Sequence, residues 1–507
     1  MISRSRLIAI GLSSLFLMVL STCQPLAAFE ETPLLTLSSE QTLAIVNPPP
    51  LKTEESNEDI IEALEVYIQS RMQTSSVPGL SVALIRQNEL VWEKGYGVTN
   101  ILTRQPVTAD TVFDVASNGK AIAAYAALDM VSKGFLALDA PMAIYFEEPW
   151  LPPLPYGNQV TLRYILSHTS GLSNNTSGRD RQIAFPPGDD FSYSGAGFRY
   201  LQETIEEISG ESINPVIQQM VLTPLGMKSS SYAHRDDLQS RTATGHFPAL
   251  NLIGIFSIPF IAFFLALIIF ASIFSRLRAG VWLPPRKVLI ALGAVAAVSP
   301  TVIARAVLSY YIARFIQTAS LYGMIFWVVM LGAYYLIVKS AAKIPWRQTV
   351  SRRSPPRIAT VLAMLVVTVI LLGAAYKTPA PLRPRSYSHG NIAFSFRSTA
   401  GDLARFLIEV SNPQAIPPEL AVLIQEPQIK VNQHNSWGLG MGIQHSSVGD
   451  SLWHWGASTG YRSIMVVYPQ QDIGVVVLTN SNDGLELARD IAQFALGGLN
   501  EWDISSD

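Results

Sequence analysis

Ser117 and Lys120 stand three residues apart in the stretch ASNGK, where an apolar, alanine-rich segment begins. On a helix this spacing puts both side chains on one face, within reach of each other. A serine hydroxyl becomes a useful nucleophile when a neighbouring base takes its proton, and a desolvated lysine can be that base because burial lowers its pKa. The simpler interpretation is that Ser117 only caps a helix, since serine is a favoured N-cap residue. A second Ser-x-x-Lys pair, Ser340 and Lys343, lies beside an apolar stretch, so the surroundings of Ser117 must decide.

The composition points to membrane segments and away from nucleic acid. The 507 residues are 49% hydrophobic and only 15% charged, which is apolar for a soluble protein. The formal net charge of -2 offers no electrostatic attraction for nucleic acid. Because Cys23 is the single cysteine, an internal disulfide framework and a cysteine-rich metal site are both excluded.

The N-terminus reads as an export signal. Two arginines precede an apolar run over residues 7–20, and small residues follow. The stretch LSTC at 20–23 resembles a bacterial lipoprotein signal with Cys23 as the lipidated residue, and cleavage after PLAA at 25–28 is the alternative. Either interpretation makes residues 1–28 a signal and predicts that the following domain is exported.

Four long apolar stretches occupy residues 250–377. Each approaches or exceeds the roughly 20 residues that cross a bilayer as a helix. The connections after the first and third stretches are rich in lysine and arginine, whereas the connection after the second carries only Arg305 and Arg314. The positive-inside rule therefore places the first and third connections in the cytoplasm and both flanking segments outside. The sequence predicts a multi-pass plasma-membrane protein in contact with the lipid bilayer.

The two outer segments, 52–249 and 388–500, each carry part of one α+β pattern. Paired apolar runs around a polar turn predict hairpins at 79–97 and 461–481. Helix patterns with a capping residue or a terminal glycine lie between these hairpins, at 199–210 and 399–410. Neither segment has a complete set of strands. We therefore predict that both segments fold together as one α+β domain around an antiparallel sheet.

Seven blocks in these segments resemble, in order, the serine β-lactamase and penicillin-binding family, in its class C-like, esterase and DD-peptidase branch. They are PGLSVALI, TVFDVASNGK, LSHTSGL, FPPGDDFSYSGAGFRYLQ, LTPLGM, STAGDLARFL and WHWGASTGYRS. The family signature combines Ser-x-x-Lys with a second polar triplet and Lys-Thr-Gly. The resemblance implies an antiparallel sheet with flanking helices plus a helical domain, here interrupted by four transmembrane helices.

The resemblance also assigns roles to individual residues. Ser117 would be the acyl-enzyme nucleophile, and Lys120 its proton acceptor or that acceptor's partner. Tyr193, in YSG at 193–195, would be a second general base that later protonates the leaving group. His454, in HWG, takes the place of the family's lysine and would donate a hydrogen bond to substrate or assist Tyr193. The backbone N–H groups of Ser117 and Ala457 would form the oxyanion hole.

Two glycines are expected to border the substrate. Gly195 stands where the family usually has an asparagine, whose carboxamide contacts the acyl amide of the substrate. The absence of this carboxamide affects the prediction of the substrate more than the prediction of the acyl-transfer residues. It would also admit a bulkier or less amide-like ligand. Gly456 follows His454 on the strand that the resemblance places along the site.

The remaining histidines give no sign of a metal or cofactor. His168 in LSHTSGL is typical of the family and is expected to be structural. None of the others shows a metal-ligand spacing such as HExxH; they are His234, His246, His389, His434 and His445. We predict no metal and no cofactor.

The sequence thus favours a membrane-anchored serine hydrolase that acts outside the plasma membrane on a peptide, ester or lactam. The alternative is a penicillin-binding-like sensor that binds wall fragments or antibiotics without efficient turnover. The acyl donor, transfer to an amine instead of water, and the oligomeric state stay open.

Overall fold

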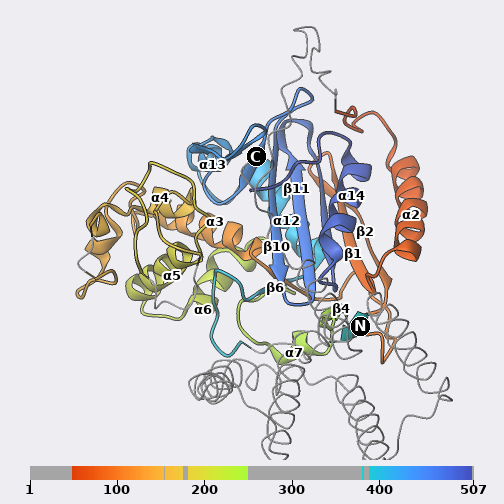
Figure 1. The fold of residues 1–507 in the computed structure, drawn as a ribbon, viewed down its shortest axis with the longest axis horizontal. Helices are drawn as coiled ribbons and strands as arrows, with labels where there is room; N and C mark the ends of the chain where they lie inside the picture. The colour runs from red at the N-terminus through yellow and green to blue at the C-terminus, as the bar shows by residue number, and fades with distance from the viewer. Residues whose placement is uncertain (1–47, 153–154, 175–180, 249–378, 382–386, 505–507) are drawn as a thin grey trace, which may run out of the picture. The chain divides into compact units, whose positions relative to one another are not determined.

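In the computed structural model, apolar strands from both outer segments meet in one antiparallel sheet (Figure 1). Its strand order is β2-β1-β12-β11-β10-β9-β8-β7. The strands are β1 (Gly79–Arg86), β2 (Glu89–Gly97), β7 (Ile429–Lys430), β8 (Asn435–Trp437), β9 (Gly442–Gln444), β10 (Ser451–Ser458), β11 (Tyr461–Tyr468) and β12 (Ile473–Thr479). The two segments join where β1 pairs with β12, from Leu80 opposite Thr479 to Arg86 opposite Ile473.

The structure describes residues 48–152, 155–174, 181–248, 379–381 and 387–504. These residues belong to one unit, Pro48–Asp507. The predicted signal at 1–28 and the four predicted spans within 250–377 lie outside the described residues. Within the described part of the chain, no helix has the length and apolar character needed to cross a bilayer.

Helices cover both faces of the sheet (Figure 1). One face packs against α2 (Asn57–Thr74) and α14 (Gly484–Leu496), which share a buried apolar cluster with alternate residues of β1, β11 and β12. The other face packs against α12 (Ala400–Ser411), which is buried in a second cluster. The α12 helix begins where Thr399 accepts a hydrogen bond from the backbone N–H of Asp402, as its capping pattern predicts. The predicted α+β architecture with flanking helices is confirmed.

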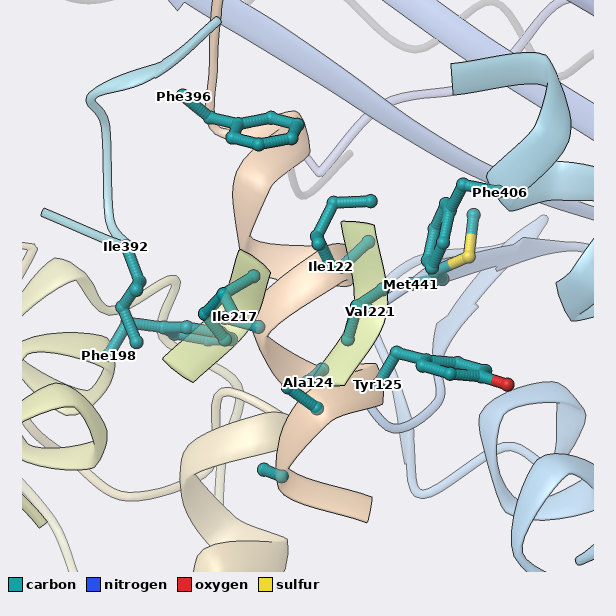
Figure 2. Close-up of a cluster of buried hydrophobic side chains, with 14 of the residues drawn as sticks. Ile122, Ala124, Tyr125, Phe198, Ile217, Val221, Ile392, Phe396, Phe406 and Met441 are labelled. Carbon is teal, nitrogen blue, oxygen red and sulfur yellow. The ribbon is translucent and has the colours of Figure 1, made fainter. Parts of the chain in front are cut away.

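The helical part of the fold is organised around α3 (Asn118–Ser132), which is buried over nearly its whole length. Figure 2 shows side chains from both outer segments packed around it, among them Phe198, Val221, Phe396 and Phe406. The other α-helices of the described residues are α4 (Leu162–Leu166), α5 (Gly195–Ser209), α6 (Ile213–Ile217), α7 (Asp236–Gln239) and α13 (Pro418–Gln425), and a π-helical turn covers Gln218–Leu222. The α5 helix ends at Gly210 in the left-handed conformation, as its terminal glycine predicts.

Two small antiparallel sheets also join the parts of the domain that precede and follow the central stretch. β3 (Phe113–Ala116) pairs with β6 (Phe396–Ser398), and β4 (His246–Pro248) pairs with β5 (Pro379–Pro381). The β4–β5 pair brings together the two points where the chain leaves and re-enters the described domain. The long central stretch is therefore an insertion between neighbouring strands of one domain.

Candidate active site

Ser117 lies at the junction between strand β3 and helix α3. The preceding residue, Ala116, has a φ of 46°, a conformation that costs free energy for a residue with a side chain. Its backbone N–H donates to Asp114 Oδ1 at 3.2 Å, which supports the turn. Ser117 occupies the N-cap position, but its side chain makes no capping hydrogen bond. Ser117 is therefore not a capping serine in the usual sense, and its hydroxyl is available for chemistry.

Lys120 lies one helical turn further along and reaches back to Ser117. Its Nζ is 3.1 Å from Ser117 Oγ and donates a hydrogen bond to the carbonyl oxygen of Ala393 at 2.6 Å. The side chain is fully buried, and desolvation lowers the pKa of its amine to about 7. A substantial fraction of Lys120 is thus neutral at neutral pH, with a lone pair that can accept the proton of Ser117.

Tyr193 is the third side chain of the site, beside Ser117 and Lys120. Its ring centroid lies 4.8 Å from Lys120 Nζ, and its phenol shares a hydrogen bond with the Ser117 hydroxyl. Burial raises the pKa of the phenol, and the hydrogen bond with Ser117 only partly opposes this rise. Tyr193 therefore keeps its proton in the resting site, which suits a proton donor better than a first base. Ser194 holds the tyrosine in place because its Oγ caps α5 through the N–H of Gly197 at 2.8 Å.

His454 reaches the same group from strand β10. Its ring centroid is 6.3 Å from that of Tyr193 and 5.5 Å from that of Trp437. Desolvation, and then the charge of Lys120, lower the pKa of the imidazole to about 3, so it is neutral. Nδ1 lies 2.9 Å from the carbonyl oxygen of Trp455 and must donate to it. With Nδ1 donating to this carbonyl, Nε2 of His454 carries no proton and is an acceptor.

His168 supports Tyr193 from behind. Its Nδ1 accepts a hydrogen bond from the backbone N–H of Ser194 at 3.0 Å, and its ring lies 4.2 Å from the Tyr193 ring. The side chain is fully buried, and desolvation holds the pKa of the imidazole well below its ordinary value. These contacts agree with the structural role expected for His168.

The two predicted substrate glycines differ in their surroundings. Gly456 faces β3: a Cβ added there would lie 2.5 Å from Ser463 Oγ and closer still to the carbonyl oxygen of Val115. Its missing side chain therefore allows β10 to pack directly on β3, beside Ser117. Gly195 is the first residue of α5 and is buried, two residues after Tyr193.

Ala457 is exposed and follows Gly456 on β10. The β9 strand pairs with β10 only as far as Trp453, so that edge of β10 has no ladder partner beyond it among the described strands. The close packing of Gly456 on β3 brings the Ala457 backbone toward the N-terminus of α3. This placement is compatible with the predicted pair of oxyanion donors, the N–H groups of Ser117 and Ala457.

One contributor has no signal in the sequence. The carbonyl of Ala393 is the acceptor that holds Lys120, and it comes from a loop in the second outer segment. The side chain of Gln202 fixes this loop by donating to the Gly390 carbonyl at 2.9 Å and accepting from the Ile392 N–H at 3.2 Å. A backbone carbonyl in a loop carries no residue-type pattern, so only the fold reveals it.

A cavity of about 620 Å³ lies at the opposite end of α3 and includes none of the predicted catalytic residues. Its lining includes Asp129, Met130, Lys133, Val216 and Met220. We place the site at Ser117 because the nucleophile and proton-transfer groups are there. No group of three metal-ligating side chains occurs among the described residues.

Comparisons with known proteins bear on the family and the fold. A family model described as Beta-lactamase matches residues 64–253 and 371–499, which is more than half of the chain. The chain is 28% identical over 200 residues to Esterase EstB of Burkholderia gladioli, covering 33% of this chain and 50% of that protein. It is 22% identical over 206 residues to Protein flp of Staphylococcus aureus, covering 37% and 41%. The chain thus spans half or less of the length of these curated relatives.

A solved structure extends the likeness to the whole fold. The D-alanine carboxypeptidase AmpC from Burkholderia cenocepacia superposes with a TM-score of 0.55 at 15% identity. The superposition covers 87% of this chain and 99% of that chain. At this identity the likeness concerns the fold alone.

Proposed function

The chain belongs to the beta-lactamase family, and on that premise we propose that it is a serine hydrolase that forms an acyl-enzyme at Ser117. The observation that carries the proposal is the 3.1 Å contact between Ser117 Oγ and a buried Lys120 whose pKa is lowered to about 7. A nucleophile beside a base that is partly neutral at working pH is the arrangement that acyl transfer requires.

In the proposed acylation, neutral Lys120 takes the proton of Ser117 as Oγ attacks the acyl carbon. The N–H groups of Ser117 and Ala457 stabilise the oxyanion, a contribution of roughly 3 kcal/mol for each donor in known sites. Tyr193 gives its proton to the leaving group, and protonated Lys120 returns the proton that it took from Ser117 to the phenolate. Water then attacks the acyl-enzyme and releases the acid.

The substrate is proposed to be a peptide, an ester or a lactam. The relatives include an esterase and a D-alanine carboxypeptidase by name. Gly195 stands where the family usually has an asparagine, so the chain has no carboxamide there to contact the acyl amide of a substrate. This absence favours esters over true β-lactams.

We further propose that the hydrolase works outside the plasma membrane, anchored by the stretch 250–377. The apolar sequence of that stretch and the charge difference between its connections support this proposal. The antiparallel β4–β5 pair supports it as well, because both ends of the insertion then leave from the same place on the domain.

The alternative, a membrane sensor, is favoured by one feature. Ala393, the acceptor of Lys120, follows β5 by only a short stretch of chain, so the return from the insertion leads directly to the catalytic lysine. Slow deacylation together with a ligand-induced change in the insertion would support a sensor, and rapid multiple turnover would count against it.

The deciding experiment uses the full-length protein in detergent and a short-chain p-nitrophenyl ester. We expect multiple turnovers, and we expect Ser117→Ala to reduce the rate to that of the buffer while the protein stays folded. Ser340→Ala, which alters the second Ser-x-x-Lys pair, serves as the matched control and should keep full activity. Hydrolysis that persists in Ser117→Ala would show that the nucleophile is wrongly assigned.

A further inference from the structure

The side chain of His454 carries a buried nitrogen that nothing in the described structure satisfies. The imidazole is 2% exposed. Its Nδ1–H is committed to the carbonyl of Trp455 at 2.9 Å, so Nε2 holds a lone pair and no proton. Nε2 has no hydrogen-bond partner among the described residues. A buried acceptor without a donor is costly, so a bound molecule that supplies an N–H or O–H gains from meeting it.

This nitrogen belongs to the active site. Alternate side chains of β10 point to the same face of the sheet. His454 shares its face with Gly456, whose Cα approaches the carbonyl of Val115 just before the nucleophile. The charge of Lys120 acts on His454, and the rings of Tyr193 and Trp437 border it.

Among the described residues, Lys120 is the one cation whose charge lowers the pKa of His454. Lys120 is itself engaged, with Nζ directed at Ser117 Oγ and the Ala393 carbonyl. A carboxylate beside His454 would thus face a lone pair and aromatic rings after losing its water, which is unfavourable.

We propose that His454 makes the site selective for acyl donors whose leaving group is uncharged and offers an N–H or O–H to Nε2, and that it disfavours leaving groups with a free carboxylate. This inference rests on the proposed acyl transfer at Ser117 and names its substrate class. It predicts preference for esters and amides with a neutral hydrogen-bonding leaving group over peptides that end in a free carboxylate next to the cleaved bond.

The test compares two acetyl esters that differ in one group, the esters of 3-hydroxybenzamide and of 3-hydroxybenzoate. Both have the same acyl group and a phenol leaving group, and dividing by the hydroxide-catalysed rate corrects for their intrinsic reactivity. We expect kcat/KM of the full-length protein to favour the benzamide ester by at least about tenfold.

Two variants assign the preference to His454. His454→Lys places a cation at the site and should lower the benzamide-to-benzoate ratio by about tenfold or more. His454→Leu removes the acceptor without adding charge, and should lower kcat/KM for the benzamide ester more than for the benzoate ester, so that the ratio moves toward one. His445→Lys adds the same charge at a partly exposed histidine paired with Asp450, and should leave the ratio as it is in the wild type.

Thermal unfolding shows whether His454→Lys folds. If it does not, the benzamide-to-benzoate ratio of kcat/KM in the wild type alone decides the proposal. Equal rates for the two esters, or faster hydrolysis of the benzoate ester, would overturn the selectivity while leaving the hydrolase intact. Failure to cleave either ester, with no acylation of Ser117, would instead overturn the proposed function and this inference with it.

Discussion

Replacing Gly456 by alanine tests whether the packing of β10 on β3 builds the active site. The added Cβ would lie 2.5 Å from Ser463 Oγ and closer to the Val115 carbonyl oxygen, whereas an ordinary contact needs about 3.4 Å. The Val115 carbonyl is backbone and cannot rotate away, so the strands must separate by roughly 1 Å. Misplacement of a catalytic group by about 1 Å can cost on the order of 100-fold in rate, and overpacking costs about 1–3 kcal/mol of stability.

We therefore expect Gly456→Ala to lower kcat for the p-nitrophenyl ester by about 100-fold, with a smaller change in KM and a measurable fall in Tm. The matched control is Gly157→Ala, because a Cβ at Gly157 meets its nearest atoms at 3.7 and 3.9 Å. That variant should match the wild type in both measurements. If Gly456→Ala acylates within about threefold of the wild-type rate, the contact between β10 and β3 does not position the oxyanion donors.

Three further predictions concern protons in the site. Lys120 must be neutral to act as a base, and its pKa is lowered to about 7. The acylation rate measured by stopped flow should therefore rise about tenfold per pH unit below pH 7 and level off above it. The same pH dependence in Lys120→Met would contradict the assignment of Lys120 as the base. Tyr193→Phe removes the proton donor, so hydrolysis of an anilide, whose leaving group needs a proton, should fall at least about 100-fold, but that of a p-nitrophenyl ester much less; equal losses would argue against Tyr193 as the acid. Burial lowers the folded-state pKa values of His454 and His246 to about 3 and about 4. The unfolded chain therefore binds more protons than the folded chain below pH 6.5, and the free energy of unfolding should decrease as the pH is lowered, by about 2 kcal/mol for each histidine at pH 5. A Tm that does not change between pH 7 and pH 5 would show that these imidazoles are not buried and neutral.

The sequence predicted the contact between Ser117 and Lys120 in the candidate site because their chemistry and spacing are local. The i, i+3 spacing of Ser117 and Lys120 placed them on one helical face, and the structure gives a direct contact. The apolar runs of β1 and β12 predicted strands from both ends of one sheet, and the two strands pair along their length.

Other features depend on the fold and could not be predicted. The protonation of His454 is set by the Trp455 carbonyl, and the position of Lys120 depends on the Ala393 carbonyl. Gly456 was predicted from its place beside the substrate, whereas the structure shows a contact with β3 that only the crossing of two strands creates. These three features arise from backbone atoms, which residue types do not encode.

Mass mapping of the acyl-enzyme tests the central claim most directly. The full-length protein is mixed with a fluorophosphonate or with a slowly deacylating ester, quenched and digested, and the modified peptide is sequenced. The geometry around Lys120 predicts one adduct, on Ser117, whose rate of formation falls sharply in Lys120→Met. An adduct on another residue, or labelling of Ser117 at an unchanged rate in Lys120→Met, would contradict the account.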